Sequence, residues 1–281
     1  VLAAALMFST GGTVIKSISL SGWQVACLRS GIAGLALFVV MHRWRHIWRP
    51  RVLLVGLAYA ATMIAFVTAN KLTTAANTIF LQSTAPLYLL LLGPWLLRER
   101  IRREDIGYAA LLAVGLVVFF VGAQVPQATA PDPLRGNMVG ALCGLTWAFS
   151  ILGLRWLGRE RQQQDDTAGA AVVAGNLIAC IACLPLALPI TAAPPTDLAL
   201  VAYLGLFQIG LAYILLTRAV AHVSALEAAL LLLLEPVAST LWAWLIHDER
   251  PSAWSLTGCL IIMITTILMT LRREPALTVK P

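Results

Sequence analysis

Long apolar runs, separated by short polar or proline-containing joins, follow one another along the whole of this 281-residue chain. Most runs hold about 17–24 residues, enough for a helix rising about 1.5 Å per residue to cross a hydrocarbon core of roughly 30 Å. The joins include helix-breaking sequences such as Pro194-Pro195. The pattern predicts an all-α polytopic membrane protein with ten transmembrane helices, over residues 2–17, 22–42, 51–70, 74–97, 105–123, 136–157, 167–190, 197–217, 224–246 and 252–271.

The two halves of the chain repeat each other. Pro86 lies thirteen residues before Glu99-Arg100, and Pro236 lies thirteen residues before Glu249-Arg250, so a shift of 150 residues superposes these segments without a gap. Each half holds five predicted helices, and an odd number of spans gives the halves opposite orientations. We therefore expect two inverted five-helix repeats around a central cavity, a design of secondary transporters. The expected divisions are a first repeat at 1–123, a linker at 124–135, a second repeat at 136–271 and a cytoplasmic tail at 272–281.

Composition and charge agree with a membrane protein. Hydrophobic residues make up 59% of the chain, charged residues make up 12%, and mean hydropathy is +0.84. The net charge of +7 comes from basic residues at helix ends, which does not indicate nucleic-acid binding. With both termini on one side, that side carries fifteen of the twenty Lys and Arg residues and the other side carries four. The positive-inside rule then predicts a multi-pass protein of the inner (plasma) membrane with both termini in the cytoplasm.

Three charged side chains fall well inside predicted helices, away from the helix ends, where charge is costly and a functional role is the default hypothesis. Glu235 lies near the middle of the ninth helix, and Glu227 lies two turns nearer the cytoplasm, at an angle that lets both face the bundle interior. Both are candidates for proton coupling, and Glu235 also for substrate binding. The alternative is that Glu235 hydrogen-bonds backbone groups freed by Pro236. Arg29, in the second helix, either reaches the interface or bridges to another helix.

Pro86 and Pro236 interrupt the backbone hydrogen bonds of the fourth and ninth helices at matching depth. Such breaks suit a hinge, or expose carbonyl groups beside a cavity. A passive kink is the alternative. The symmetry of the two positions favours a hinge or a cavity.

Polar and aromatic side chains are dense in the first, third, fourth, sixth, eighth and ninth helices, whereas the second, fifth, seventh and tenth are plainer and are expected on the outside. Individually such side chains are more often helix–helix contacts than ligand contacts. Together they favour a central cavity that is apolar with a few hydrogen-bonding groups. The candidate substrate-binding residues are Ser9, Thr13, Tyr59, Asn77, Phe80, Thr84, Tyr88, Trp147, Ser150, Tyr213, Glu235 and Trp242.

A double G-x-x-x-G motif, formed by Gly136, Gly140 and Gly144, permits close approach of the sixth helix to a neighbour. Packing inside one subunit is favoured over dimerisation. We therefore expect a monomer, with a dimer as the alternative.

Signatures of catalysis are missing from the sequence. There is no phosphate-binding Gly-Lys loop and no H-E-x-x-H motif, and the histidines lie in loops or at helix ends. Cys180 and Cys183 form a C-x-x-C inside a predicted helix, with no second pair and no nearby histidine. We expect no enzymatic activity, no cofactor and no metal site, and transport that runs on gradients rather than on nucleotide hydrolysis.

Each half of the chain holds a set of residues in a fixed order. The first set is Lys16, Arg29, Thr74, Pro86, Glu99-Arg100 and Gly107, and the second is Trp147-Ala148-Phe149-Ser150, Ser224, Glu235-Pro236 and Glu249-Arg250. In this order they resemble the EamA family of the drug/metabolite transporter (DMT) superfamily, over nearly the whole chain. The resemblance implies ten helices in two inverted repeats and a cavity lined mainly by helices 1, 3, 4, 6, 8 and 9. Phe8 departs from the family pattern, since such proteins usually have Trp there, and Trp147 holds the matching place in the sixth helix.

Many bacterial members of this family export amino acids or other metabolites, and the chain is most similar to YddG-type aromatic amino-acid exporters. We therefore expect a secondary transporter that exports small amphipathic metabolites across the inner membrane by alternating access. The favoured substrates are aromatic or large apolar amino acids. In this hypothesis, Glu235 and Asn77 meet the amino and carboxylate groups of the substrate. The alternatives are a proton-coupled exporter of lipophilic cations and, less favoured, a passive channel. Aromatic candidates for stacking are Tyr59, Phe80, Tyr88, Trp147, Tyr213 and Trp242.

Overall fold

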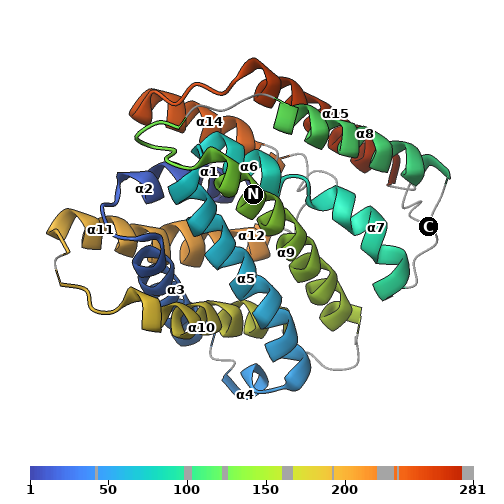
Figure 1. Ribbon diagram of the computed structural model, residues 1–281. Coiled ribbons are helices and arrows are strands. Elements are labelled where there is room, and N and C mark those ends of the chain that lie inside the picture. Colours follow the sequence, from blue (N-terminus) through green and yellow to red (C-terminus); the bar gives the residue numbers. More distant parts are fainter. Residues whose placement is uncertain are drawn as a thin grey trace.

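The computed structural model describes residues 1–41, 44–97, 103–121, 126–159, 167–191, 193–219, 231–232 and 234–273, and these residues are mainly helical (Figure 1). The described part of the linker forms a turn with an isolated antiparallel bridge between Gln127 and Ala130. The helices are α1 (Leu2–Ser9), α2 (Gly11–Ser17), α3 (Gly22–Met41), α4 (Trp44–Ile47), α5 (Pro50–Leu72), α6 (Ala75–Gln82), α7 (Ala85–Leu97), α8 (Arg103–Val121), α9 (Pro133–Arg159), α10 (Thr167–Ala187), α11 (Pro195–Tyr203), η1 (Leu204–Leu211), α12 (Ala212–Ala219), α14 (Leu234–His247) and α15 (Ala253–Arg273).

The architecture confirms an all-α polytopic membrane protein. Among the described residues, eight helical spans are long and apolar enough to cross a bilayer. Two predicted helices are not among these eight. The first, 2–17, is divided into the short helices α1 and α2, and the ninth, 224–246, lies partly outside the described residues. Most other bounds lie within a few residues of the predicted ones. The sixth helix begins early, at Pro133, because proline suits the first turn of a helix.

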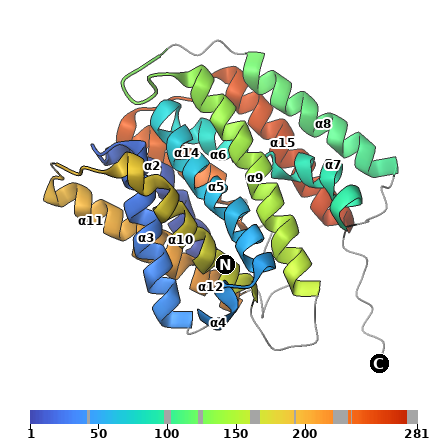
Figure 2. The same cartoon turned by 60° about the horizontal axis from the view of Figure 1, so that its bottom comes forward.

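The two halves of the chain are interlocked, as the views in Figures 1 and 2 show. Helix α8 packs against α15 on one flank of the bundle, and α3 packs against α10 on the opposite flank. Between the flanks, α5 packs against both α9 and α10. Each of these contacts joins a helix of the first half to a helix of the second. The turn at 126–132 lies at one end of the bundle, the linker end, and α4 lies at the opposite end.

Small residues allow the helices to approach closely. A Cβ added at Gly258 of α15 would lie 2.6 Å from the carbonyl oxygen of Gly115 in α8. In α9, a Cβ added at Gly144 would lie 2.6 Å from the carbonyl oxygen of Leu81 in α6. The G-x-x-x-G motif of α9 thus packs against its neighbours within one subunit, the arrangement that the sequence favoured over a dimer contact.

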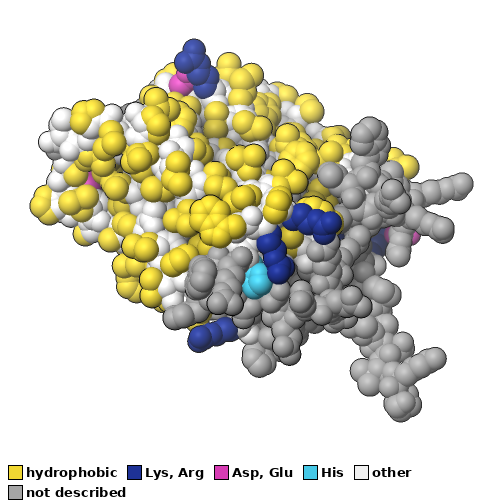
Figure 3. All heavy atoms as spheres, turned by 90° about the horizontal axis from the view of Figure 1, so that it is seen from below, with side chains coloured by type: hydrophobic (Ala, Val, Ile, Leu, Met, Phe, Trp, Pro, Cys, Tyr) yellow, Lys and Arg dark blue, Asp and Glu magenta, His cyan; other side chains and the backbone are white. Residues whose placement is uncertain are grey.

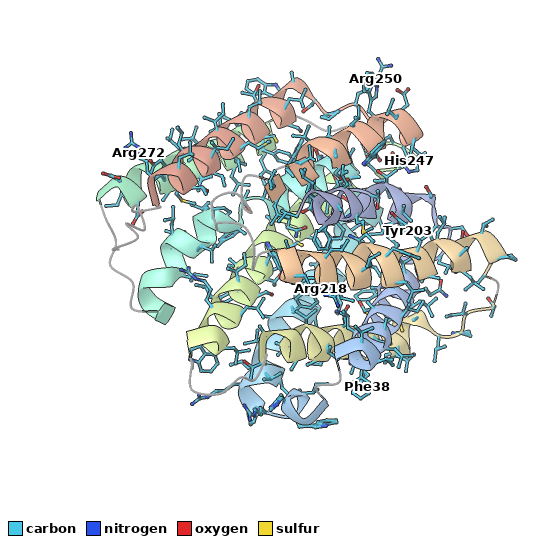
Figure 4. The ribbon with its side chains drawn as sticks, turned by 180° about the vertical axis from the view of Figure 1, so that it is seen from behind. Phe38, Tyr203, Arg218, His247, Arg250 and Arg272 are labelled. Atoms are coloured by element: carbon cyan, nitrogen blue, oxygen red, sulfur yellow. The ribbon has the colours of Figure 1, made fainter. Side chains whose placement is uncertain are left out.

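Large apolar side chains cover the outside of the bundle. Leu54 is 62% exposed and Ile181 is 68% exposed. Figure 3 shows one face on which hydrophobic side chains form a broad area while basic side chains gather in a few places. Monomeric soluble proteins rarely expose so large an apolar surface, whereas a bilayer would cover it. Figure 4 shows Arg250 and His247 at one end of the molecule and Arg272 at the other, as expected of polar groups that flank an apolar layer.

Candidate functional site

A cavity of about 120 Å³ lies inside the bundle. Each of the six helices implied by the family resemblance contributes to its wall, and α3, the second predicted helix, contributes as well. Both halves of the chain therefore share one central site. The lining residues are Phe8, Arg29, Tyr59, Met63, Phe66, Gln82, Trp147, Gln208, Ile209, Tyr213, Leu216, Leu232 and Glu235.

Helices beside this cavity depart from regular α-helical geometry. Thr10 separates α1 from α2, and α6 ends at Gln82, four residues before Pro86. A proline ring clashes with the carbonyl group four residues before it, which explains where α6 ends. Residues 204–211 form a π-helix, η1, which carries the cavity residue Gln208. Irregular backbone inside a membrane is tolerated where it is buried in protein or lines a cavity, and π segments are frequent at functional sites.

Aromatic rings form much of the cavity wall. The Tyr213 ring of α12 contacts two other rings of the wall. Its centroid lies 6.1 Å from that of Phe8 and 6.1 Å from that of Tyr59, and both contacts are edge-to-face. Phe66 and Trp147 add further aromatic surface from α5 and α9. Edge-to-face pairs hold each ring in a defined orientation, so the wall is a preformed aromatic surface.

Two oppositely charged side chains face the same cavity, Arg29 from α3 and Glu235 from α14. Arg29 is 2% exposed, and its Nε and Nη1 atoms have no hydrogen-bond partner in the described part of the chain. Its Nη2 lies 3.8 Å from the sulfur of Met63, and its guanidinium carbon lies 5.6 Å from the centroid of Phe66. Glu235 is half-buried and forms no hydrogen bond or ion pair with the described residues. Buried charges without protein partners are candidates for ligand binding.

Four of the twelve candidate residues named from the sequence line the cavity: Tyr59, Trp147, Tyr213 and Glu235. The structure does not place the other eight in the lining. Phe80 is buried in the apolar core, and Thr13 is buried in α2. Five more, among them Ser9, make contacts that hold helices together or satisfy backbone groups. Trp242 donates to Ser9 Oγ at 3.0 Å, Ser150 Oγ lies 3.3 Å from Thr62 Oγ1, Thr84 donates to the Leu81 carbonyl at 2.6 Å, and Tyr88 donates to the Ala141 carbonyl at 3.3 Å.

Sequence reasoning missed several lining residues. Phe8, Met63 and Phe66 were not among the candidate substrate-binding residues, because apolar side chains around a cavity resemble an ordinary core in sequence. Arg29 was expected at the interface or in a bridge between helices, on a helix placed outside the bundle. In the structure it contacts Met63 and Phe66 of α5, in line with the second alternative, and it also lines the cavity. The signal that could have found it was its charge inside an apolar run.

Comparison with known proteins bears on what such a cavity does. The EamA-like transporter family matches this chain over residues 1–121 and over residues 134–271. The chain belongs to the EamA-like transporter family. Members are non-enzymatic secondary transporters of the DMT superfamily, so this protein is a multi-pass membrane transporter with a small-molecule substrate. The two matched segments divide the chain at the linker, consistent with two repeats.

A solved structure described only as "Crystal structure of protein" is similar in fold to this EamA-like transporter. The TM-score is 0.62 at 20% sequence identity, over 97% of this chain and 96% of the other. At this identity the likeness concerns the fold alone. None of the curated proteins compared with the chain matches it.

A second set of buried charges joins the halves of this EamA-like transporter at the linker end. Lys16 Nζ lies 3.0 Å from Glu249 Oε1, and the two side chains are only 2% and 1% exposed. Lys16 also donates to the carbonyl oxygen of Thr73 at 2.7 Å and to that of Thr129. Glu249 Oε2 accepts a hydrogen bond of 2.8 Å from the backbone N–H of Ala75, in the first turn of α6. The carboxylate thus lies where the helix dipole favours negative charge.

Asn77, which was predicted to meet the substrate, belongs to this end rather than to the cavity wall. Its side-chain nitrogen donates to Thr73 Oγ1 at 3.2 Å and to Asn137 Oδ1 at 3.3 Å. Thr73 Oγ1 also donates to Asn137 Oδ1 at 2.8 Å. This network fixes the start of α6 against α9. Of the other positions named from the sequence, Glu227, Glu99-Arg100 and residues 274–281 lie outside the described residues.

Proposed function

We propose that this EamA-like transporter exports small amphipathic metabolites, foremost amino acids with aromatic or large apolar side chains. The observation that carries the proposal is a single cavity that combines aromatic walls with opposite charges lacking partners in the described residues. An amino-acid zwitterion with a large side chain carries the complementary groups. This proposal places the protein with the aromatic amino-acid exporters among its possible subgroups.

The size and surface of the cavity support a substrate of this class. Because one water needs about 10–15 Å³ of such space, 120 Å³ accommodates roughly ten water-sized groups. That is the scale of one amino acid rather than of a peptide. Tyr59, Trp147 and Tyr213 offer ring faces and edges to an aromatic side chain. In this proposal Glu235 accepts hydrogen bonds from the substrate ammonium group, which would supply a partner that the carboxylate lacks among the described residues.

Alternating access provides the mechanism of this proposal. Two inverted repeats, at 1–123 and 136–271, rock about the cavity, and the breaks at Pro86 and Pro236 act as hinges. The break before Pro86 supports this role, because α6 ends at Gln82, which lines the cavity. With both termini in the cytoplasm of the inner membrane, the linker end faces outward. Opening toward the outside would then require the Lys16–Glu249 contact to separate.

Uptake into proteoliposomes tests the proposed substrate class. Labelled tryptophan, phenylalanine, threonine and a lipophilic cation would be offered with and without an imposed pH gradient. We expect saturable uptake of the two aromatic amino acids, stimulated by the same amino acid on the opposite side. Cation movement without amino-acid uptake would overturn the proposal, and unsaturable flux without counterflow would indicate a channel.

A proton-coupled exporter of lipophilic cations is the second candidate. The observation that favours it is the carboxylate of Glu235, which has no partner among the described residues. Arg29 weighs against it, because a buried guanidinium on the same cavity repels a cation. The Glu235→Gln variant separates the two candidates. A proton-coupled exporter would lose gradient-driven uptake and keep exchange, whereas a facilitative amino-acid carrier would show weaker binding and no dependence on the pH gradient in either form.

A further inference from the structure

Arg29 is a buried cation, and most of its hydrogen-bond donors are unused among the described residues. It lies in the middle of the bundle with 2% of its surface exposed, and its Nε and Nη1 atoms find no acceptor in the described part of the chain. These two nitrogens carry three of the five N–H donors of a guanidinium. The contacts that it does make, with the sulfur of Met63 at 3.8 Å and with the ring of Phe66, are weak for a charged donor.

A purely structural arginine would be expected to look different. Buried charged donors are normally paired with carboxylates or backbone carbonyls, because an unpaired donor forfeits its hydration without compensation. In this protein Lys16 meets that expectation, with a carboxylate and two carbonyl oxygens around its ammonium group. Arg29 has no such acceptor among the described residues, so its free donors are suited to binding a ligand.

The cavity wall also holds acceptors that could bind a ligand. Glu235 brings a carboxylate, and Gln82 and Gln208 each bring a buried side-chain oxygen with no hydrogen-bond partner in the described residues. Among the described residues that line the cavity, Arg29 provides the positive charge. A ligand that offers one anionic acceptor and one cationic donor would satisfy both sets, and a guanidinium fits a carboxylate better than any other common metabolite group except phosphate.

We propose that the Arg29 guanidinium binds the carboxylate of the transported substrate, which makes it a specificity-determining residue. This inference rests on the proposed function and deepens it: the substrates are carboxylates that bear an apolar or aromatic group, and amines lacking a carboxylate are excluded. Asn77 does not serve this purpose, because its amide is engaged by Thr73 and Asn137. In the same proposal, Glu235 and the glutamine oxygens bind the ammonium group.

Three matched probes test the assignment in the full-length transporter reconstituted into proteoliposomes. L-Phenylalanine carries both charged groups, 3-phenylpropionate lacks the ammonium group, and 2-phenylethylamine lacks the carboxylate. The wild-type protein should take up phenylalanine, be inhibited by phenylpropionate and respond poorly to phenylethylamine. In Arg29→Gln, the KM for phenylalanine should rise about tenfold or more, and phenylpropionate should lose inhibition, while the response to phenylethylamine stays the same or improves.

Two further variants serve as controls. Arg29→Lys keeps the charge but loses the planar donor array, so its KM should lie between those of the wild type and Arg29→Gln. Arg250→Gln makes the same exchange at a position with 76% exposure, far from the cavity lining, and should leave all three responses unchanged. A binding measurement covers variants with low turnover: saturating phenylalanine should raise the melting temperature of the wild type but not that of Arg29→Gln.

The outcomes separate this inference from the proposed function. If Arg29→Gln changes the responses to phenylalanine and phenylethylamine by the same factor, Arg29 is structural and the inference is wrong. If the wild type carries only amines, both proposals fail. If it ignores aromatic amino acids but carries another carboxylate, and Arg29→Gln loses that activity, the assignment of Arg29 stands while the aromatic preference fails.

Discussion

The two sets of buried charges in this protein differ in what surrounds them. At the linker end, Lys16 and Glu249 are almost fully buried and surrounded by partners: each meets the other, two carbonyl oxygens surround the ammonium, and a helix N-terminus faces the carboxylate. In the cavity, Arg29 is as deeply buried as Lys16 and has no comparable partner among the described residues. Burial alone therefore does not distinguish a structural charge from a functional one in a membrane protein.

The two kinds of charge differ in whether other groups of the described protein use their hydrogen-bonding capacity. A satisfied pair adds no binding capacity, and its value lies in fixing which segments meet. Here the pair ties α2, the start of α6 and the loop before α15 together. An unsatisfied pair keeps its capacity for a ligand, and the protein bears the cost in its empty state. This contrast can be tested in both directions.

The largest effect is expected from breaking the satisfied pair. Glu249→Gln leaves the Lys16 ammonium buried without a countercharge, and Lys16→Met does the same to the carboxylate. Each single change should lower the free energy of unfolding by about 3–5 kcal/mol. The double variant should recover much of that loss, because it removes both charges. Unfolding of the purified variants in mixed detergent micelles measures the three differences as a double-mutant cycle.

The surface provides a matched control for this cycle. Arg250 Nε lies 3.3 Å from Asp248 Oδ1, but the two side chains are 76% and 77% exposed, so solvent screens their attraction. Asp248→Asn should change stability by less than about 1 kcal/mol. If Glu249→Gln were no more harmful than Asp248→Asn, the linker-end pair would not be the structural contact described above.

A smaller effect is expected from disturbing the packing of the same end. Gly136 of α9 lies against Thr73, and a Cβ added there would come within 2.6 Å of both the backbone nitrogen and the Cβ of Thr73. Gly136→Ala should therefore push α9 away from the start of α6 and destabilise the protein by about 1–3 kcal/mol. Gly107→Ala is the control, since nothing lies within 4 Å of the added Cβ, and it should be neutral or slightly stabilising. Equal stability of the two variants would show that α9 is not held tightly at this end.

The helices of this protein could be predicted from the sequence more completely than the residues of its cavity. The length of the apolar runs and the shift of 150 residues were enough to predict the helices, because bilayer thickness constrains helix length strongly. The break in the fourth helix followed from the proline rule, which places its end at Gln82, four residues before Pro86. The break at Thr10 precedes Gly11-Gly12, a weaker helix-breaking signal, and the π-helix at 204–211 carries no comparable local signal.

The candidate site was only partly predictable. Tyr59, Trp147, Tyr213 and Glu235 were found because large aromatic or charged residues in apolar helices stand out. Asn77 stood out equally, yet the structure uses it between helices, because a buried amide is satisfied equally well by a protein partner or a ligand. Which of the two a residue meets depends on the rotation of its helix and on its neighbours across the bundle, and a single sequence does not contain that information.

The smallest expected change in stability concerns the unsatisfied charge, and its sign is the informative part. Arg29→Met replaces a cation that has no charged or carbonyl partner among the described residues by an apolar side chain of similar length, next to Met63 and Phe66. In the substrate-free protein we expect no loss of stability, and a gain of up to about 2 kcal/mol, because the desolvated charge is removed and no partner among the described residues loses a contact with it. Arg29→Lys keeps the charge and should not show this gain. The unfolding measurement used for Lys16→Met decides the comparison. If Arg29→Met lowers stability as much as Lys16→Met does, both buried cations are structural. If the two changes have opposite signs, Lys16 stabilises the fold and Arg29 is kept for binding a ligand.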